Sequence, residues 1–317
     1  MKQPLINRIV VATDFSECAE RAVEYGIYFA LGWSAHVDFI SVVETLPGLE
    51  FDRPFADPLT ELRRKESERL LGELAARVQR EQLDVNWHVR HGIPSQEIVQ
   101  AVLEQQADLL VVGTHGRTGL EDIMLGSTAE RVIKQAPCPV LTVRACRSTA
   151  KQDATVPPHV RHVLAPVDFS SPSLDALEYA VQLVDGFGAK LTLLHVLEPI
   201  YYDLEFGLGR IEKEAEKRTH WEAQLDSLAQ VVKERGLAAS SMVLGGIPSE
   251  SIRACAEQQG CDLIVMGTHG RRGLTRLRYG SAAEGVLRQA HCPVLTVRSP
   301  KFAPGHRRVV PQAMSEA

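Results

Sequence analysis

Short apolar runs alternate along the chain with stretches whose apolar residues recur every three or four positions. The run at 8–13 is typical of a strand buried on both faces, and Ser16 can cap a helix that continues to Gly32. Further apolar runs predict strands at 35–43, 84–90, 108–113 and 140–144. Helices are expected up to about 81, from Pro94 onward, and at about 127–135. This alternation predicts an α/β fold with an open parallel sheet and helices on both faces.

The same pattern occurs twice, 154 residues apart. The segment T-D-F-S at 13–16 returns as V-D-F-S at 167–170, and C-P-V-L-T-V-R at 138–144 returns at 292–298. Of the 54 positions from 91 to 144, 30 are identical to their partners, so the chain is a duplication. We expect domains at 1–146 and 159–300, a polar linker at 147–158 and a loose tail at 301–317.

Charge and cysteine content narrow the class of protein. The net charge of -5 gives no basic surface for nucleic acid or an acidic membrane, and no apolar stretch is long enough to span a bilayer. The six cysteines show no C-x-x-C spacing, which favours free thiols in a reducing cytoplasm. Cys138 and Cys292, each before a proline, are expected to be buried rather than reactive. We therefore expect a cytoplasmic protein without nucleic-acid or membrane partners.

Each copy carries three spaced glycines and a serine after its fourth predicted strand. Nine residues separate the first pair from the last pair, and the members are Gly113, Gly116, Gly126 and Ser127 in the first copy and Gly267, Gly270, Gly280 and Ser281 in the second. Glycines let the backbone approach phosphate oxygens, and the N–H groups at a helix start bind anionic charge. Gly126 and Gly280 are expected to hold a φ angle that a bulky residue cannot. The alternative is an inherited structural turn.

Several catalytic and nucleotide motifs are absent from the sequence. It contains no G-x4-G-K-[ST], no G-x-G-x-x-G after a first strand, and no G-x-S-x-G elbow. No base and nucleophile recur together in both copies, so rapid turnover has no visible machinery. Binding is therefore favoured over catalysis.

The G-x2-G-x9-G-S pattern, the acidic residue after the first strand and the C-P-V-L-T-V segment together resemble the universal stress protein family, in its tandem, ATP-binding form. The resemblance covers about residues 5–145 and 159–299. It implies two five-stranded sheets of order 3-2-1-4-5, like those of the adenine nucleotide alpha-hydrolases. It also implies ATP in the crevice between the first and fourth strands, where open α/β sheets bind ligands.

Specific residues follow from this expectation. Asp14 and Asp168 should reach the crevice, where a carboxylate suits a ribose hydroxyl or a metal ion; the alternative is a helix N-cap. Ser127 and Ser281 can donate to phosphate or bind Mg²⁺ that accompanies ATP. By resemblance, the adenosine contacts are Ala12, Thr13, Val42, Pro166, Val167 and Val196. The remaining candidates beside the glycine loop are Val112, Thr128, Met266 and Ala282.

Charged residues inside the loop leave two interpretations open. His115 and His269 can donate a hydrogen bond to phosphate or lie exposed as spectators, and Arg117 and Arg271 can screen phosphate charge or be solvated. The second loop contains more arginines (Arg272, Arg276 and Arg278) than the first, so the two sites are expected to differ in affinity.

The leading functional hypothesis is an ATP-binding stress or signalling protein whose nucleotide occupancy sets its conformation and its choice of protein partner. The alternative is a slow ATPase or phosphotransferase that uses the same loop, and the third is a scaffold with empty loops. We expect the last strands, 140–144 and 294–298, to pair within the chain as a pseudo-dimer, since each is otherwise an exposed sheet edge; a homodimer remains open.

Overall fold

The chain divides into two compact units. The computed structural model describes residues 5–44, 58–114, 125–144, 157–198, 208–268, 280–298, 302, 306 and 308–311. Unit 1 comprises Met1–His159 with Lys301–Ala303, and unit 2 comprises Val160–Pro300 with Pro304–Ala317.

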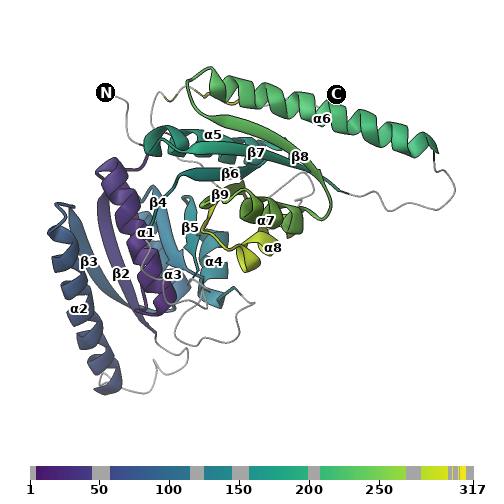
Figure 1. The fold of residues 1–317 in the computed structure, drawn as a ribbon. Coiled ribbons are helices and arrows are strands. Elements are labelled where there is room, and N and C mark those ends of the chain that lie inside the picture. Colours follow the sequence, from purple (N-terminus) through teal and green to yellow (C-terminus); the bar gives the residue numbers. More distant parts are fainter. Residues whose placement is uncertain are drawn as a thin grey trace. The chain divides into compact units, whose positions relative to one another are not determined.

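Unit 1 alternates strands and helices as the apolar pattern predicts. Its elements are β1 (Arg8–Ala12), α1 (Glu17–Trp33), β2 (His36–Glu44), α2 (Pro58–Gln79), β3 (Val85–Gly92), α3 (Pro94–Glu104), β4 (Leu109–Gly113), α4 (Ser127–Gln135) and β5 (Val140–Val143). The described strands pair in parallel in the order β3-β2-β1-β4-β5. Helices cover both faces of the sheet (Figure 1).

Unit 2 repeats this architecture element by element. Its elements are β6 (His162–Pro166), α5 (Ser171–Phe187), β7 (Lys190–Leu197), α6 (Leu208–Lys233), β8 (Ala239–Gly245), α7 (Pro248–Gln258), β9 (Leu263–Gly267), α8 (Ser281–Gln289) and β10 (Val294–Val297). Its described strands pair in parallel in the order β8-β7-β6-β9-β10. Both units therefore confirm the expected strand order 3-2-1-4-5.

The first strand of each unit is apolar because both of its faces are covered. Ile9, Val10 and Val11 are fully buried in β1, and no alternation with polar residues is possible there. A carboxylate fixes the start of this strand: Oδ2 of Asp108 accepts hydrogen bonds from the backbone N–H groups of residues 7 and 8, at 2.9 and 3.1 Å. Asp262 repeats the contact in unit 2.

The end of the first helix differs from the sequence-based expectation. Gly32 lies within α1, which ends at Trp33, and Ser34 is the C-cap with φ 54° and ψ 39°. The equivalent residue in unit 2 is Gly188, with φ 65° and ψ 30°. The helix ends where the backbone turns left-handed rather than at the first glycine, and unit 1 adopts this conformation with a residue that disfavours it.

We expect Ser34→Gly to stabilise unit 1 by about 0.5–1 kcal/mol, because glycine removes the left-handed backbone strain. The stabilisation is smaller than the strain itself, since glycine also raises the conformational entropy of the unfolded chain. Gly188→Ser is the reciprocal change in open space, since no atom lies within 4 Å of an added Cβ there. It should destabilise unit 2 by a similar amount. Urea unfolding measures both, and a loss of stability in Ser34→Gly would contradict the expectation.

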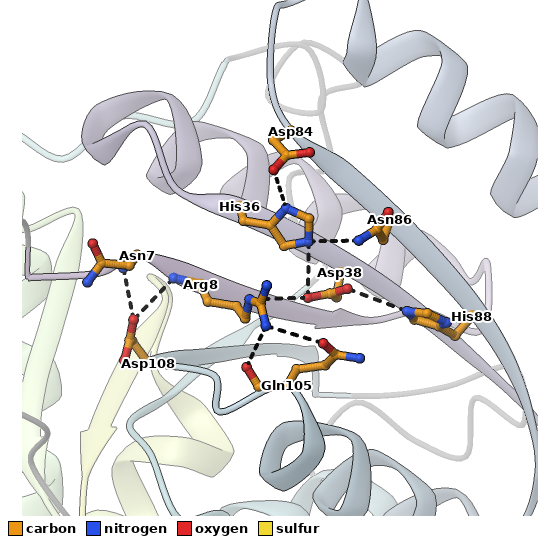
Figure 2. Close-up of polar contacts among 9 residues, drawn as sticks. All are labelled: Asn7, Arg8, His36, Asp38, Asp84, Asn86, His88, Gln105 and Asp108. Atoms are coloured by element: carbon orange, nitrogen blue, oxygen red, sulfur yellow. Dashed lines mark hydrogen bonds and ion pairs between the residues drawn. The ribbon is translucent and has the colours of Figure 1, made fainter.

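Unit 1 buries a charged cluster at the amino ends of its strands, opposite the edge where ligands bind in such sheets. Figure 2 shows Asp38 between Arg8, His36 and His88. Asp38 is fully buried; its oxygens lie 3.3 Å from Nε2 of His36, 3.5 Å from Nε2 of His88 and 3.9 Å from Nε of Arg8. Asp84 fixes the His36 ring through Nδ1 at 2.8 Å. The buried carboxylate is thus surrounded by basic side chains.

Unit 2 has an uncharged residue, Thr192, in the place of the buried Asp38. Nε2 of His162 lies 2.8 Å from Oγ1 of Thr192, which lies 3.1 Å from Oγ of Ser240. Burial, and then the nearby Lys190, lower the pKa of His162, so this ring is neutral at pH 7. The same structural position therefore tolerates a charged or an uncharged network.

The C-terminal segment differs from the loose tail that we expected. His306 and residues 308–310 lie against α5, where buried Glu178 accepts hydrogen bonds from His306, Val309 and Val310. The sequence could not predict these contacts from apolar periodicity, because they are made chiefly by backbone N–H groups and single polar side chains. Among the described helices, none is long and apolar enough to cross a membrane.

Candidate functional site

The candidate site of unit 1 lies at the carboxyl ends of β1, β2 and β4. Ala12 is in register with Ile40 of β2 on one side and with Val112 of β4 on the other. The backbone N–H of Thr13 donates to the carbonyl of Ile40 at 2.9 Å, which keeps the chain beside β2 beyond the end of the strand. The strand order reverses between β1 and β4, which is the point where open α/β sheets generally bind ligands.

A tight turn follows the first strand in both copies. Oδ1 of Asp14 accepts hydrogen bonds from the backbone N–H and hydroxyl of Ser16, at 3.1 and 2.6 Å. Phe15 adopts a left-handed φ of 62° between them. Ser16 is the N-cap of α1, so the N-cap alternative for Asp14 is wrong: this carboxylate orients the capping serine instead. Unit 2 repeats the arrangement with Asp168 and Ser170, at 3.0 and 2.5 Å.

The glycine loop is closed at its base by a backbone hydrogen bond. In unit 1 the N–H of Gly126 donates to the carbonyl of Thr114 at 2.8 Å, and in unit 2 the N–H of Gly280 donates to Thr268 at 3.0 Å. Both threonines are 1% exposed. Sequence reasoning missed them, although the repeated G-T-H-G-R segment was a signal that could have found them.

The helix after the loop begins without a side-chain cap. Gly126 is the N-cap of α4 and Gly280 the N-cap of α8, and neither helix has a side-chain hydrogen bond at its cap. Their φ angles are −59° and −62°, which any residue adopts, so the expected unusual φ is wrong. These glycines place neither a Cβ nor a capping side chain beside the first N–H groups of the helix.

The structure locates most of the candidate residues. Six of them, His115, Gly116, Arg117, His269, Gly270 and Arg271, lie outside the described residues. Val112 and Met266 are buried, at 4% and 5% exposed. The partly exposed strand-end residues are Val42, Pro166 and Val196. Thr128 and Ala282 lie in the first turns of α4 and α8, after Ser127 and Ser281.

The first glycine of the loop serves helix packing. A Cβ on Gly267 would lie 2.9 Å from the carbonyl oxygen of Pro172 and 3.2 Å from the backbone nitrogen of Ser173. On Gly113 it would lie 3.1 Å from the backbone of Cys18 and Ala19. This glycine therefore lets the helix that follows the Asp turn approach the end of the fourth strand.

Gly267→Ala should destabilise unit 2 by about 1–3 kcal/mol, because the first turn of α5 must shift to admit the methyl group. Gly72→Ala is the matched control: no atom lies within 4 Å of the added Cβ, and alanine suits the interior of α2. Urea unfolding should show a loss for Gly267→Ala and no loss for the control. Equal stabilities for Gly267→Ala and the parent would contradict this packing role.

The two sites differ in the side chains that pack beside the turn after the first strand, at residues 14–16 in unit 1 and 168–170 in unit 2. In unit 2, Phe169, His195 and Trp221 stack with ring centroids 4.8 to 5.4 Å apart. Nδ1 of His195 lies 2.7 Å from the carbonyl oxygen of Val167, which confirms His195 as a packed strand residue. The equivalent of His195 in unit 1 is the buried Ser41. This aromatic support belongs to the second site, and the contribution of Trp221 from α6 had no sequence signal.

The described cysteines are buried free thiols, as expected for Cys138 and Cys292; Cys146 lies outside the described residues. Burial raises the pKa of the Cys261 and Cys292 thiols to about 12, and it raises that of Cys255 as well. These thiols stay protonated at neutral pH and do not act as nucleophiles.

We expect the stability of unit 2 to fall above pH 9. Below the ordinary thiol pKa of 9.0 the thiols are protonated in both the folded and the unfolded state, so their contribution to the free energy of unfolding is fully present. As the pH rises toward about 12, the unfolded thiols ionise while the folded ones do not, which costs at most about 1.4 kcal/mol per pH unit per thiol. Urea unfolding between pH 7 and 10.5 tests this, and Cys292→Ala should have a shallower decline. An identical decline in that variant would contradict the assignment.

Within the described ranges, no group of three or more His, Cys, Asp or Glu side chains could hold a metal ion.

Comparisons with known proteins find relatives for both copies. The profile of the Universal stress protein family matches residues 6–144 and again 159–298. A universal stress protein from Methanocaldococcus jannaschii is 37% identical over 142 residues, which cover 44% of this chain and 83% of that protein. A universal stress protein A homolog from Coxiella burnetii is 34% identical over 148 residues, which cover 44% of this chain and 96% of that protein.

Solved structures share the fold. The crystal structure of a universal stress protein from Archaeoglobus fulgidus matches 92% of this chain and 96% of its own with a TM-score of 0.68, at 21% identity, which shows the fold alone. A universal stress protein solved in complex with cAMP matches 44% of this chain and 98% of its own at 25% identity, with a TM-score of 0.35.

Proposed function

The chain belongs to the universal stress protein family, and on that premise we propose that each unit binds ATP at the carboxyl ends of its first and fourth strands. Membership of this family supports a role in the stress response. In the proposal, nucleotide occupancy sets the conformation of each unit and its choice of protein partner.

One observation carries the proposal: the helix after the glycine loop begins at an uncapped glycine in both units. Its first N–H groups have no partner within the helix, and the helix dipole adds a positive end at the same place. The cap angles agree between copies, at φ −59° and ψ 142° for Gly126 and φ −62° and ψ 145° for Gly280. This donor set suits the phosphates of a nucleotide.

The other residues fit the remainder of the nucleotide. Asp14 and Asp168, held beside the first strand by their serines, can accept hydrogen bonds from ribose hydroxyls. The apolar strand ends at Ala12 and Val42 offer a surface for the adenine. Ser127, at the start of α4, and Ser281, at the start of α8, can donate to phosphate or bind Mg²⁺, which would bridge phosphate oxygens and neutralise their charge.

The proposal is for binding rather than rapid hydrolysis. The described site residues supply donors, acceptors and apolar contacts, but no described acid-base pair is common to the two units at this edge. Slow ATP hydrolysis or phosphoryl transfer is the alternative outcome, and product analysis over hours distinguishes it from binding alone. The more basic second loop in the sequence predicts tighter binding in unit 2.

Calorimetry and native mass spectrometry test the proposal. We expect at least one ATP per chain, and two when both sites are filled, with affinity that Mg²⁺ increases. Titrations with ADP, GTP and cAMP measure what the site requires of the base and phosphates. The absence of any bound nucleotide at millimolar ATP and Mg²⁺ would overturn the proposal.

A further inference from the structure

The C-terminal segment is anchored to a buried carboxylate on α5. We call His306 with residues 308–310 the strap. The side chain of Glu178 is fully buried. Its Oε1 accepts a hydrogen bond from Nε2 of His306 at 2.6 Å, and its Oε2 accepts two from the backbone N–H groups of Val309 and Val310, at 2.9 and 2.7 Å. A carboxylate only accepts, so three donors from one segment satisfy it.

A second contact lies one helical turn earlier. Arg308 donates to Oδ1 of Asp175 at 2.5 Å, and Val310 is 2% exposed in the folded chain. The strap therefore contacts α5 over about one turn, from Asp175 to Glu178, through an ion pair and a buried acceptor, and it adds the buried apolar residue Val310. These contacts restrict it far more than a surface tail with one ion pair.

Unit 1 has a different solution at the same positions. Glu24, the equivalent of Glu178, pairs with Arg21 on its own helix at 2.5 Å, and its side chain is 44% exposed. Unit 2 has Asp175 where unit 1 has Arg21. Two acidic residues three positions apart on a helix repel each other. The strap supplies the positive charge and the donors that α5 lacks.

The strap shares α5 with the second candidate site. Ser170, the N-cap of α5, donates to Asp168, and the first turn of α5 packs on Gly267. The contacts of the strap begin at Asp175, in the turn that follows. A shift in the first half of α5 therefore reaches Asp168 and Gly267, two of the candidate residues of unit 2.

We infer that the strap is a built-in latch for unit 2: when closed it clamps the first half of α5, and when released it loosens the Asp168 turn. The effect on ATP rests on the proposed function, and it is reciprocal, since a ligand that needs an ordered Asp168 turn also favours the closed strap. Unit 1 has no equivalent contact among the described residues.

Glu178→Ala in the full chain tests the latch, with Glu24→Ala as the matched control 154 positions earlier. Hydrogen exchange of the amides of Val309 and Val310 should be slow in the parent and accelerate at least about tenfold in Glu178→Ala, since both lose their acceptor. The amides in the first half of α5 should also exchange faster. Neither region should change in Glu24→Ala.

Arg308→Ala provides a milder opening that leaves α5 intact, should Glu178→Ala fail to fold. It should accelerate the same amides by a smaller factor. In a Gly126→Val background, which leaves only the second site, opening the strap should weaken ATP binding by roughly threefold to tenfold.

Two results would overturn the latch. One is exchange of the Val309 and Val310 amides in the parent as fast as in an unstructured peptide. The other is an unchanged α5 in both variants after the strap has opened. If the parent binds no ATP, the proposed function fails, and the exchange of α5 alone decides the latch. If the parent binds ATP and strap opening leaves the affinity of the second site unchanged, the coupling fails while the proposed function stands.

Discussion

The double variant Gly126→Val, Gly280→Val should lose ATP binding at both sites while it remains folded. Valine places a branched side chain where phosphate must approach the helix N-terminus. Loss of a charge-assisted contact to phosphate is worth roughly 1.5–3 kcal/mol, which lowers affinity by about tenfold to a hundredfold at each site. Each single variant should lose one site only. Calorimetric titration of the parent, the two single variants and the double variant with ATP measures the number of sites and their affinities.

Valine at these two positions should introduce no backbone strain that could itself unfold the units. Both glycines have φ near −60°, which valine adopts, so destabilisation should stay within about 1–3 kcal/mol. Gly72→Val supplies a matched control, because its added Cβ has no atom within 4 Å. A folded double variant that binds ATP as tightly as the parent would show that the glycines are structural turns, and the proposed function would be wrong.

Phe29→Ala should destabilise unit 1 by about 3–5 kcal/mol. Phe29 is fully buried on α1 and contacts the rings of Tyr28 and Trp33, with centroids 6.0 and 5.5 Å away. Its removal leaves a cavity under a helix that also packs on Gly113 at the candidate site. This loss is a large fraction of the stability of an ordinary domain. Urea unfolding measures this loss, with the dependence of the free energy of unfolding on urea concentration fitted separately for each variant.

Leu31→Ala is the control on the same helix. Leu31 is 49% exposed, so its truncation should change the free energy of unfolding by about 0.5 kcal/mol or less. Similar losses in the two variants would mean that α1 does not face the sheet as described. Reduced ATP affinity in Phe29→Ala, at a temperature where unit 1 remains folded, would show that α1 transmits its packing to the site.

The glycine loop illustrates how far the sequence could predict the site. The spacing identified Gly126 and Ser127 at a helix start, and α4 begins at Ser127. The backbone bond from Gly126 to Thr114 was missed, because a carbonyl acceptor has no residue signature. For Asp14 the sequence left two roles open, nucleotide ligand and N-cap; the cap is its neighbour Ser16, and the ligand role stays a prediction.

The sequence by itself determined the duplication and the α/β class, because a repeat of 154 residues and an apolar periodicity can both be recognised along the chain. The strand order was expected from the family resemblance, and the location of the site stays a prediction. Only the tertiary structure decided which residues that are far apart in the sequence contact one another. The strap joins residues 131 and 132 positions apart, and the surroundings of Asp38 come from three strands. Whether a carboxylate is buried, and which donors satisfy it, depends on packing between distant segments, so no local pattern could reveal Glu178 as an anchor.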